Sequence, residues 1–168
     1  IAAMVALSAI TATFTTLFMG TVSDRIGRRK PFMTWGYVIW ALTVAAFAFV
    51  SPSSMKSVGV AATMVVVLDC VMTFFGSTAN DAVFNAYVTE SVEEEKRTKV
   101  ESVVQIMPMA AMLIVFGVLD GFTQRGEWKA FFLITAAIML MAGILSFFFI
   151  KDDRREKRDK GSFLSNLI

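Results

Sequence analysis

The chain has 168 residues, of which 56% are hydrophobic and only 18% charged, and its formal net charge is +2. A soluble domain usually has about 25% charged residues, so this composition excludes an ordinary soluble protein, and the small net charge gives no reason to expect a nucleic-acid partner. There is no histidine and a single cysteine, Cys70, which removes the commonest metal ligand and general base as well as any disulfide framework. We therefore expect a membrane protein without a cofactor, metal site or enzymatic activity; a membrane-embedded enzyme is the least favoured alternative.

Five apolar stretches are long enough to cross a bilayer, because about 20 helical residues span its hydrocarbon core. They are expected at residues 1–20, 32–50, 58–88, 99–119 and 128–150. Short connections between them predict an all-α, up-and-down transmembrane bundle over residues 1–150, followed by a charged linker at residues 151–168. Because the chain starts within an apolar run, we expect a piece of a longer protein that begins in or just before its first visible span.

Basic residues are distributed unevenly between the two ends of these spans. Thirteen Lys and Arg residues fall in the first loop, the third loop and the tail, against three on the other side. The positive-inside rule places the richer side in the cytoplasm. We expect a multi-pass protein of the plasma (inner) membrane whose chain starts outside and whose tail is cytoplasmic.

The first basic loop has a distinctive sequence, and residues 20–30 read GTVSDRIGRRK. Its arginines and lysine fit a positive anchor at the anionic leaflet, which is the simplest explanation. That explanation leaves out Gly20, Asp24 and Gly27. Glycines permit turns and close helix approach, and an aspartate can cap a neighbouring helix, so the loop is expected to have a defined structure.

The expected span at 58–88 contains polar residues, whereas the span at 32–50 is almost wholly apolar and is expected at the periphery of the bundle. Asp69 lies near the middle of the former, where a charge costs at least about 2.5 kcal/mol on insertion scales. At about 100° per residue, four other polar residues share an arc of about 120° with Asp69. They are Thr73, Ser77, Asn80 and Asp81. This face either lines a solute pathway, with Asp69 as a proton or cation site, or forms a polar seam in which a protonated Asp69 is hydrogen-bonded to a neighbouring helix.

These patterns resemble those of a known family. The conserved cytoplasmic motif between helices two and three of the major facilitator superfamily is similar to Gly20-x-x-x-Asp24-Arg25-x-Gly27-Arg28-Arg29-Lys30. Residues 90–98, ESVEEEKRT, are similar to the acid-to-arginine loop between helices four and five of that family, with Glu90 and Arg97 in the corresponding places. The five spans would then be helices two to six of the amino-terminal six-helix half. A weaker similarity, at residues 27–32 and 95–98, is to the sugar-cation symporter branch.

The resemblance implies a secondary transporter that moves a small solute by alternating access, with proton- or sodium-coupled symport of a sugar-like substrate as the finer expectation. Its partners would be the solute, a coupling cation, the lipid bilayer, and the missing first helix and carboxyl-terminal half of the same protein. The family motif also implies that Arg28 pairs with Glu90 to close an inner gate. The residues around Pro108 and the lack of a basic residue at 57–95 do not fit the drug-proton antiporters of the family. The alternative function is a non-transporting membrane scaffold or sensor that retains the fold.

Overall fold

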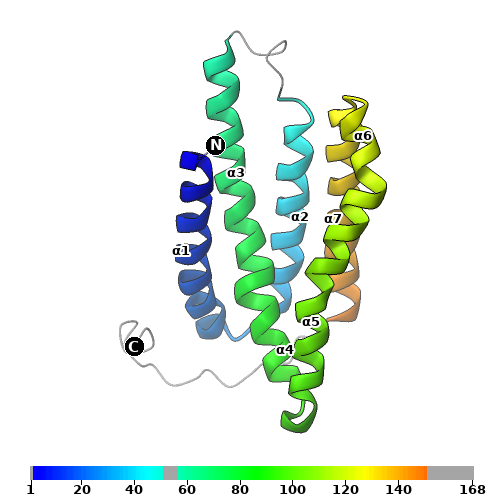
Figure 1. The fold of residues 1–168 in the computed structure, drawn as a ribbon. Coiled ribbons are helices and arrows are strands. Elements are labelled where there is room, and N and C mark those ends of the chain that lie inside the picture. The colour runs from blue at the N-terminus through cyan, green and yellow to red at the C-terminus, as the bar shows by residue number, and fades with distance from the viewer. Residues whose placement is uncertain (1, 51–56, 151–168) are drawn as a thin grey trace.

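The computed structural model describes residues 2–50 and 57–150, which form a bundle of long helices that run alternately up and down (Figure 1). In chain order the elements are α1 (Ala2–Ile26), α2 (Lys30–Phe47), α3 (Val58–Gly76), η1 (Ser77–Phe84), α4 (Asn85–Ser91), α5 (Glu94–Ile114), η2 (Val115–Leu119), α6 (Asp120–Gln124) and α7 (Trp128–Phe149). The two η elements are π-helices, and each continues the helices on both sides of it. The predicted all-α membrane bundle is confirmed for the part of the chain described, and the linker expected at 151–168 lies outside it.

Four helical stretches are long and apolar enough to cross a membrane, judged by length and composition alone. They are Met4–Ile26, Val58–Ser91, Glu94–Gln124 and Trp128–Phe149. The fifth expected span corresponds to α2, which has 18 residues and a length of about 27 Å. Lys30 and Pro31 lie in its first turn and lower its mean hydropathy. The count of five spans therefore remains a prediction.

Helix α2 packs against its neighbours over most of its surface and keeps a narrow exposed face, on which Trp35 is 65% and Leu42 61% exposed. It packs against α7, α3 and η1, and Figure 1 shows it between α3 and α7. Small residues permit the close approach: a Cβ atom added at Gly36 would lie 2.8 Å from the Cβ of Ala79. Small residues are typical of helix contacts in membranes, where association depends on packing. An apolar sequence fits either lipid or protein neighbours, so it could not show which face of α2 packs against the other helices.

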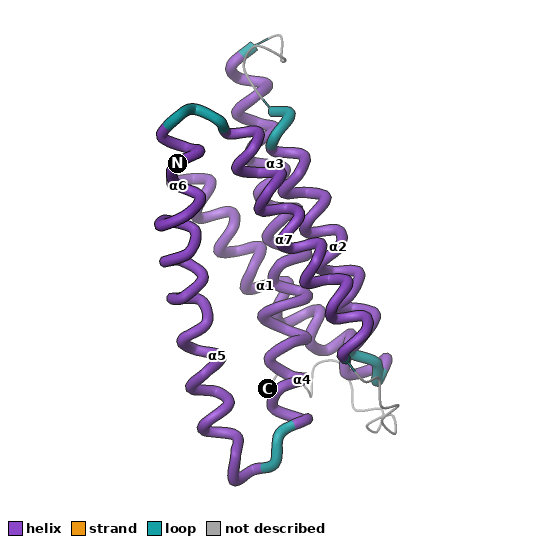
Figure 2. The backbone as a smooth tube through the Cα atoms, turned by 90° about the vertical axis from the view of Figure 1, so that its right-hand side faces the viewer, coloured by secondary structure: helices purple, strands orange, loops and turns teal. Residues whose placement is uncertain are grey.

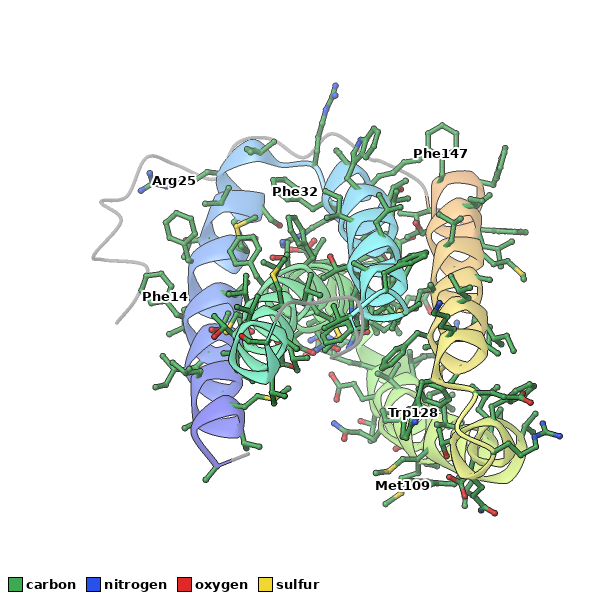
Figure 3. The ribbon with its side chains drawn as sticks, turned by 90° about the horizontal axis from the view of Figure 1, so that it is seen from above. Phe14, Arg25, Phe32, Met109, Trp128 and Phe147 are labelled. Atoms are coloured by element: carbon green, nitrogen blue, oxygen red, sulfur yellow. The ribbon has the colours of Figure 1, made fainter. Side chains whose placement is uncertain are left out.

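The outer surface of the bundle is strongly apolar. Figure 3 shows Phe14 of α1 and Met109 of α5 pointing away from the other helices, and both are exposed. Helix α5 buries none of its residues in the described structure, and Figure 2 shows it standing apart from α1. Apolar surface of this extent is typical of contact with lipid or with further membrane helices.

One end of the bundle carries most of the described basic side chains, and we call it the basic end. The turn between α1 and α2, the turn between α4 and α5 and the last turn of α7 lie there, at the bottom of Figure 1. The Arg and Lys residues of these segments are Arg25, Arg28, Arg29, Lys30, Lys96, Arg97 and Lys99. The candidate site lies at this end.

Candidate functional site

The motif at residues 20–30 is mostly helical and is not the eleven-residue loop that the sequence suggested. Helix α1 continues to Ile26 and α2 begins at Lys30, so only three residues form the turn. Gly27 has a φ of +67°, and its N–H donates a hydrogen bond to the carbonyl of Ser23 at 3.0 Å. A glycine in the left-handed conformation commonly ends a helix. The requirement for glycine is therefore explained at Gly27.

Arg29 is the centre of the polar contacts at the basic end. Its Nη2 atom lies 2.6 Å from Asp24 Oδ1 and 2.8 Å from Glu90 Oε1, and its Nε atom donates to Glu90 Oε2 at 3.4 Å. Nη1 also donates to the hydroxyl of Ser23, which is fully buried. The arginine thus uses two N–H groups on the two oxygens of Glu90, the directional form of this ion pair. It joins the end of α1, the start of α2 and α4.

Burial shapes the electrostatics of this cluster. The side chain of Arg29 is only 13% exposed, against 30% for Glu90 and 55% for Asp24. Burial acts to lower the pKa of Arg29, but the hydrogen bond to Glu90 and the charges of Asp24 and Glu90 outweigh it, and the pKa is raised above its usual value. A raised pKa means that the paired, charged arginine is favoured in the folded protein. Arg29 therefore remains cationic in this cluster throughout the physiological range of pH.

The structure adds a partner of Glu90 that the sequence reasoning did not name. We expected Arg28 to pair with Glu90, which stays a prediction, and the guanidinium of Arg29 lies 2.8 Å from Glu90. Gly27 reverses the chain, which leaves Arg28 exposed and Arg29 partly buried as the N-cap residue of α2. Sequence reasoning also missed Ser23, whose only signal is its position one residue before Asp24. Neighbouring arginines cannot be told apart without the path of the turn.

The second motif joins α4 to α5. Arg97, in the first turns of α5, donates from Nη2 to the carbonyl oxygen of Thr89 at 2.9 Å. The last carbonyls of a helix have no partner within it, so a basic side chain can satisfy them. Lys96 and Glu93 form a separate pair at 2.6 Å, with both side chains about 70% exposed or more. Arg97 therefore has a structural contact here, and the Lys96 pair lies in solvent.

A cavity of about 400 Å³ lies between α1 and the η1–α4 segment, beside Arg29. Its lining residues are Thr16, Gly20, Asp24, Arg29, Asp81, Ala82, Asn85, Ala86, Thr89 and Glu90. The α1 residues among them recur every four positions, which puts them on one helix face. Nothing lies within 4 Å of a Cβ atom added at Gly20, so this glycine borders open space and serves no close helix contact within the described residues.

Asp69 is separate from this cavity. It is 9% exposed, and the hydroxyl of Ser8 on α1 donates a hydrogen bond to its Oδ2 atom. Ser8 is the hydrogen-bond partner of Asp69 within the described part of the chain. This contact is what a polar seam between helices requires, and it leaves Oδ1 for a proton or cation, so the two interpretations of Asp69 both remain open.

The polar face predicted from Asp69 to Asp81 is divided by the π-helix. Asp69 and Ser77 are buried and Thr73 is partly buried, whereas Asn80 and Asp81 are exposed. A π-helical turn holds more residues than the 3.6 of an α-helix, so the 100° spacing used for the prediction does not apply after Ser77. Asp81 lines the cavity and Asp69 does not.

The polar side chains of η1 are linked to α2. The hydroxyl of Tyr37 donates to Asn80 Oδ1 at 3.3 Å, and Asn80 Nδ2 donates to Asp81 Oδ1 at 3.2 Å. No pattern in the sequence connected Tyr37 with these residues, because α2 was expected at the periphery. Among the residues described, no three Cys, Asp or Glu side chains are grouped so that they could hold a metal ion.

Comparison with known proteins now adds to this geometry. The sequence model of the family described as Major Facilitator Superfamily matches residues 1–165. A search of curated proteins gave no match, and neither did a search of solved structures. The family match covers nearly the whole chain and includes both motifs around Arg29, Glu90 and Arg97. The chain therefore belongs to the Major Facilitator Superfamily, a family of membrane transporters.

Proposed function

We propose that this chain supplies helices two to six of the amino-terminal half of a secondary transporter that moves a small solute by alternating access. The basic end faces the cytoplasm, in agreement with the positive-inside rule. A sugar-like solute and a coupling proton or sodium ion are the finer proposal, supported by the similarity at residues 27–32 and 95–98 and by the membrane acid Asp69. The observation that carries the proposal is the Arg29 cluster at the basic end.

The cluster acts as the inner gate in this proposal. Arg29 holds Asp24 of α1 and Glu90 of α4 at the same time, and the cavity lies between those two helices. When the ion pairs separate, α1 and α4 are free to part and the cavity opens to the cytoplasm. Coupling free energies of this kind are about 1–3 kcal/mol, which corresponds to about 5- to 150-fold in an equilibrium constant.

The gate is tested by labelling a cysteine in the cavity. Ala86→Cys is introduced into the complete protein with Cys70→Ala, and a membrane-impermeant maleimide is added from the cytoplasmic side. We expect Arg29→Gln and Glu90→Gln each to raise the labelling rate by about 5- to 150-fold. Because the pKa of Arg29 is raised from an already high value, the effect should be the same from about pH 6 to 9.

Glu93→Gln is the matched control, because Glu93 also forms an ion pair but is 75% exposed. Exposed pairs contribute about 0–1 kcal/mol, so its labelling rate should stay close to that of the parent. Equal rates in the parent, Arg29→Gln and Glu90→Gln would rule out the gate.

Transport itself is tested in proteoliposomes that contain the complete protein. Uptake of a panel of mono- and disaccharides is measured under imposed proton or sodium gradients. Accumulation that follows one gradient would support coupled symport, and uptake without accumulation would indicate a uniporter. A protein that opens and closes in the labelling assay but moves no solute would favour the scaffold or sensor alternative.

A further inference from the structure

The long helix that runs from Val58 to Ser91 changes its geometry in the middle. The eight residues of η1 (Ser77–Phe84) are π-helical, between α-helical segments on both sides. π-Helices are rare, usually consist of a single turn and occur frequently at functional sites. The segment η1 contains Asn80 and Asp81, and it separates the membrane acid Asp69 from the gate residue Glu90.

Helix α2 packs closely against this π-helical segment. The Cβ of Ala79 would lie only 2.8 Å from a Cβ atom at Gly36, and the ring of Trp40 covers Gly76, the residue before η1, at 3.0 Å from the position of its missing Cβ. Tyr37 adds the hydrogen bond to Asn80. Ala79 is fully buried. The register of η1 is thus matched to the surface of α2.

One polar atom in this contact is left unsatisfied. The indole N–H of Trp40 is buried, and no hydrogen-bond partner for it lies within the described residues. A buried donor without a partner destabilises the structure that contains it. The packing of α2 on η1 therefore carries a cost, and a second arrangement of the segment that gives this N–H a partner would relieve it.

The segments on the two sides of η1 are held by different contacts. Asp69 of α3 is bound by Ser8, and Glu90 of α4 is bound by Arg29 at 2.8 Å. A one-residue change of register within η1 would rotate α4 relative to α3 by about 100° and shift it by about 1.5 Å. Since the carboxylate of Glu90 must remain within hydrogen-bonding distance of Arg29, such a rotation would break the pair.

We infer that η1 is a conformational switch: its π-helical form holds Glu90 on Arg29, and its conversion to an α-helix rotates α4 and releases the gate. The inference rests on the proposed gate and adds the element that moves within this half. During this conversion α3 stays in place with the contact between Asp69 and Ser8, while α4 rotates. A two-state element of this kind gives the polar residues Asn80 and Asp81 a physical link to the gate.

The switch is tested with nitroxide side chains placed singly at residues 86–89 of α4 and 64–67 of α3 in the complete protein with Cys70→Ala. The accessibility of each nitroxide to oxygen is measured in the parent and in the variants Arg29→Gln and Gly36→Ala. Gly36→Ala is chosen because its new methyl group forces Ala79 away from α2. We expect the accessibility maximum to move by one residue along 86–89 and to stay unchanged along 64–67. Gly117→Ala, where nothing lies within 4 Å of the added Cβ atom, should move neither.

The outcomes separate the switch from the gate. If the accessibility maximum along residues 86–89 stays at the same residue in both Arg29→Gln and Gly36→Ala, the switch is overturned. Equal changes in both runs of labels also overturn it, because the long helix then moves as one rigid rod. The gate fails by a different result, unchanged maleimide labelling at Ala86→Cys in Arg29→Gln, and the Gly36→Ala measurement then decides the switch alone.

Discussion

The close packing of α2 against α7 predicts a large difference between two glycines. A Cβ atom added at Gly143 would lie 3.2 Å from Tyr37 Cβ, 3.3 Å from Val38 Cγ2 and 3.4 Å from the backbone N of Val38, whereas one added at Gly117 meets nothing within 4 Å. Replacing glycine by alanine contributes up to about 1 kcal/mol of α-helix propensity at Gly143 in α7, whereas Gly117 lies in the π-helix η2. Overpacking costs about 1–3 kcal/mol. The packing cost should therefore make Gly143 the less tolerant of the two sites.

We expect Gly143→Ala to be less stable than Gly117→Ala by about 1 kcal/mol, and Gly143→Leu to be less stable than Gly117→Leu by about 3 kcal/mol, because three more carbons must enter the contact. Thermal unfolding of the detergent-purified protein, followed by tryptophan fluorescence, measures the difference. At 150–250 residues each kcal/mol corresponds to about 2–4 °C in Tm, and to less in a longer chain. Equal Tm values for the two leucine variants would refute the packing of α2 against α7.

Two further predictions concern single contacts. Asp69→Asn should abolish gradient-driven accumulation of solute in proteoliposomes if Asp69 binds the coupling cation, whereas Ser8→Ala removes only the hydrogen bond and should leave accumulation unchanged. Unchanged accumulation in Asp69→Asn would exclude the cation role. Equal losses in both variants would favour the polar seam between helices. The Nζ atom of Lys30 lies 4.7 Å from the ring centre of Phe147. A double-mutant cycle of Lys30→Met and Phe147→Leu should therefore give a coupling free energy of about 0.5–1 kcal/mol in unfolding experiments. A coupling of zero would show that this contact does not stabilise the protein.

Local signals were enough for some features of this chain. Hydropathy and the alternation of basic loops gave the all-α bundle and brought the two motifs to one end, because the bilayer constrains helix length and charge position strongly. The offsets of glycine, aspartate and arginine at residues 20–30 identified the family. They also marked Glu90 as a partner of this motif, although Arg29, which contacts Glu90 in the structure, was not the arginine expected there.

Other features depend on contacts between segments distant in the chain, and only the tertiary structure decided them. The left-handed turn at Gly27 brings Arg29 to Glu90, and the small-residue contact between Gly36 and Ala79 packs α2 against η1. The π-helix η1 divides a polar face that α-helical spacing had predicted to be continuous. The sequence by itself therefore determined the all-α membrane class and the family, since these follow from local composition and motif spacing. The partners within the Arg29 cluster follow from how the backbone turns and packs, which no local pattern in the sequence records.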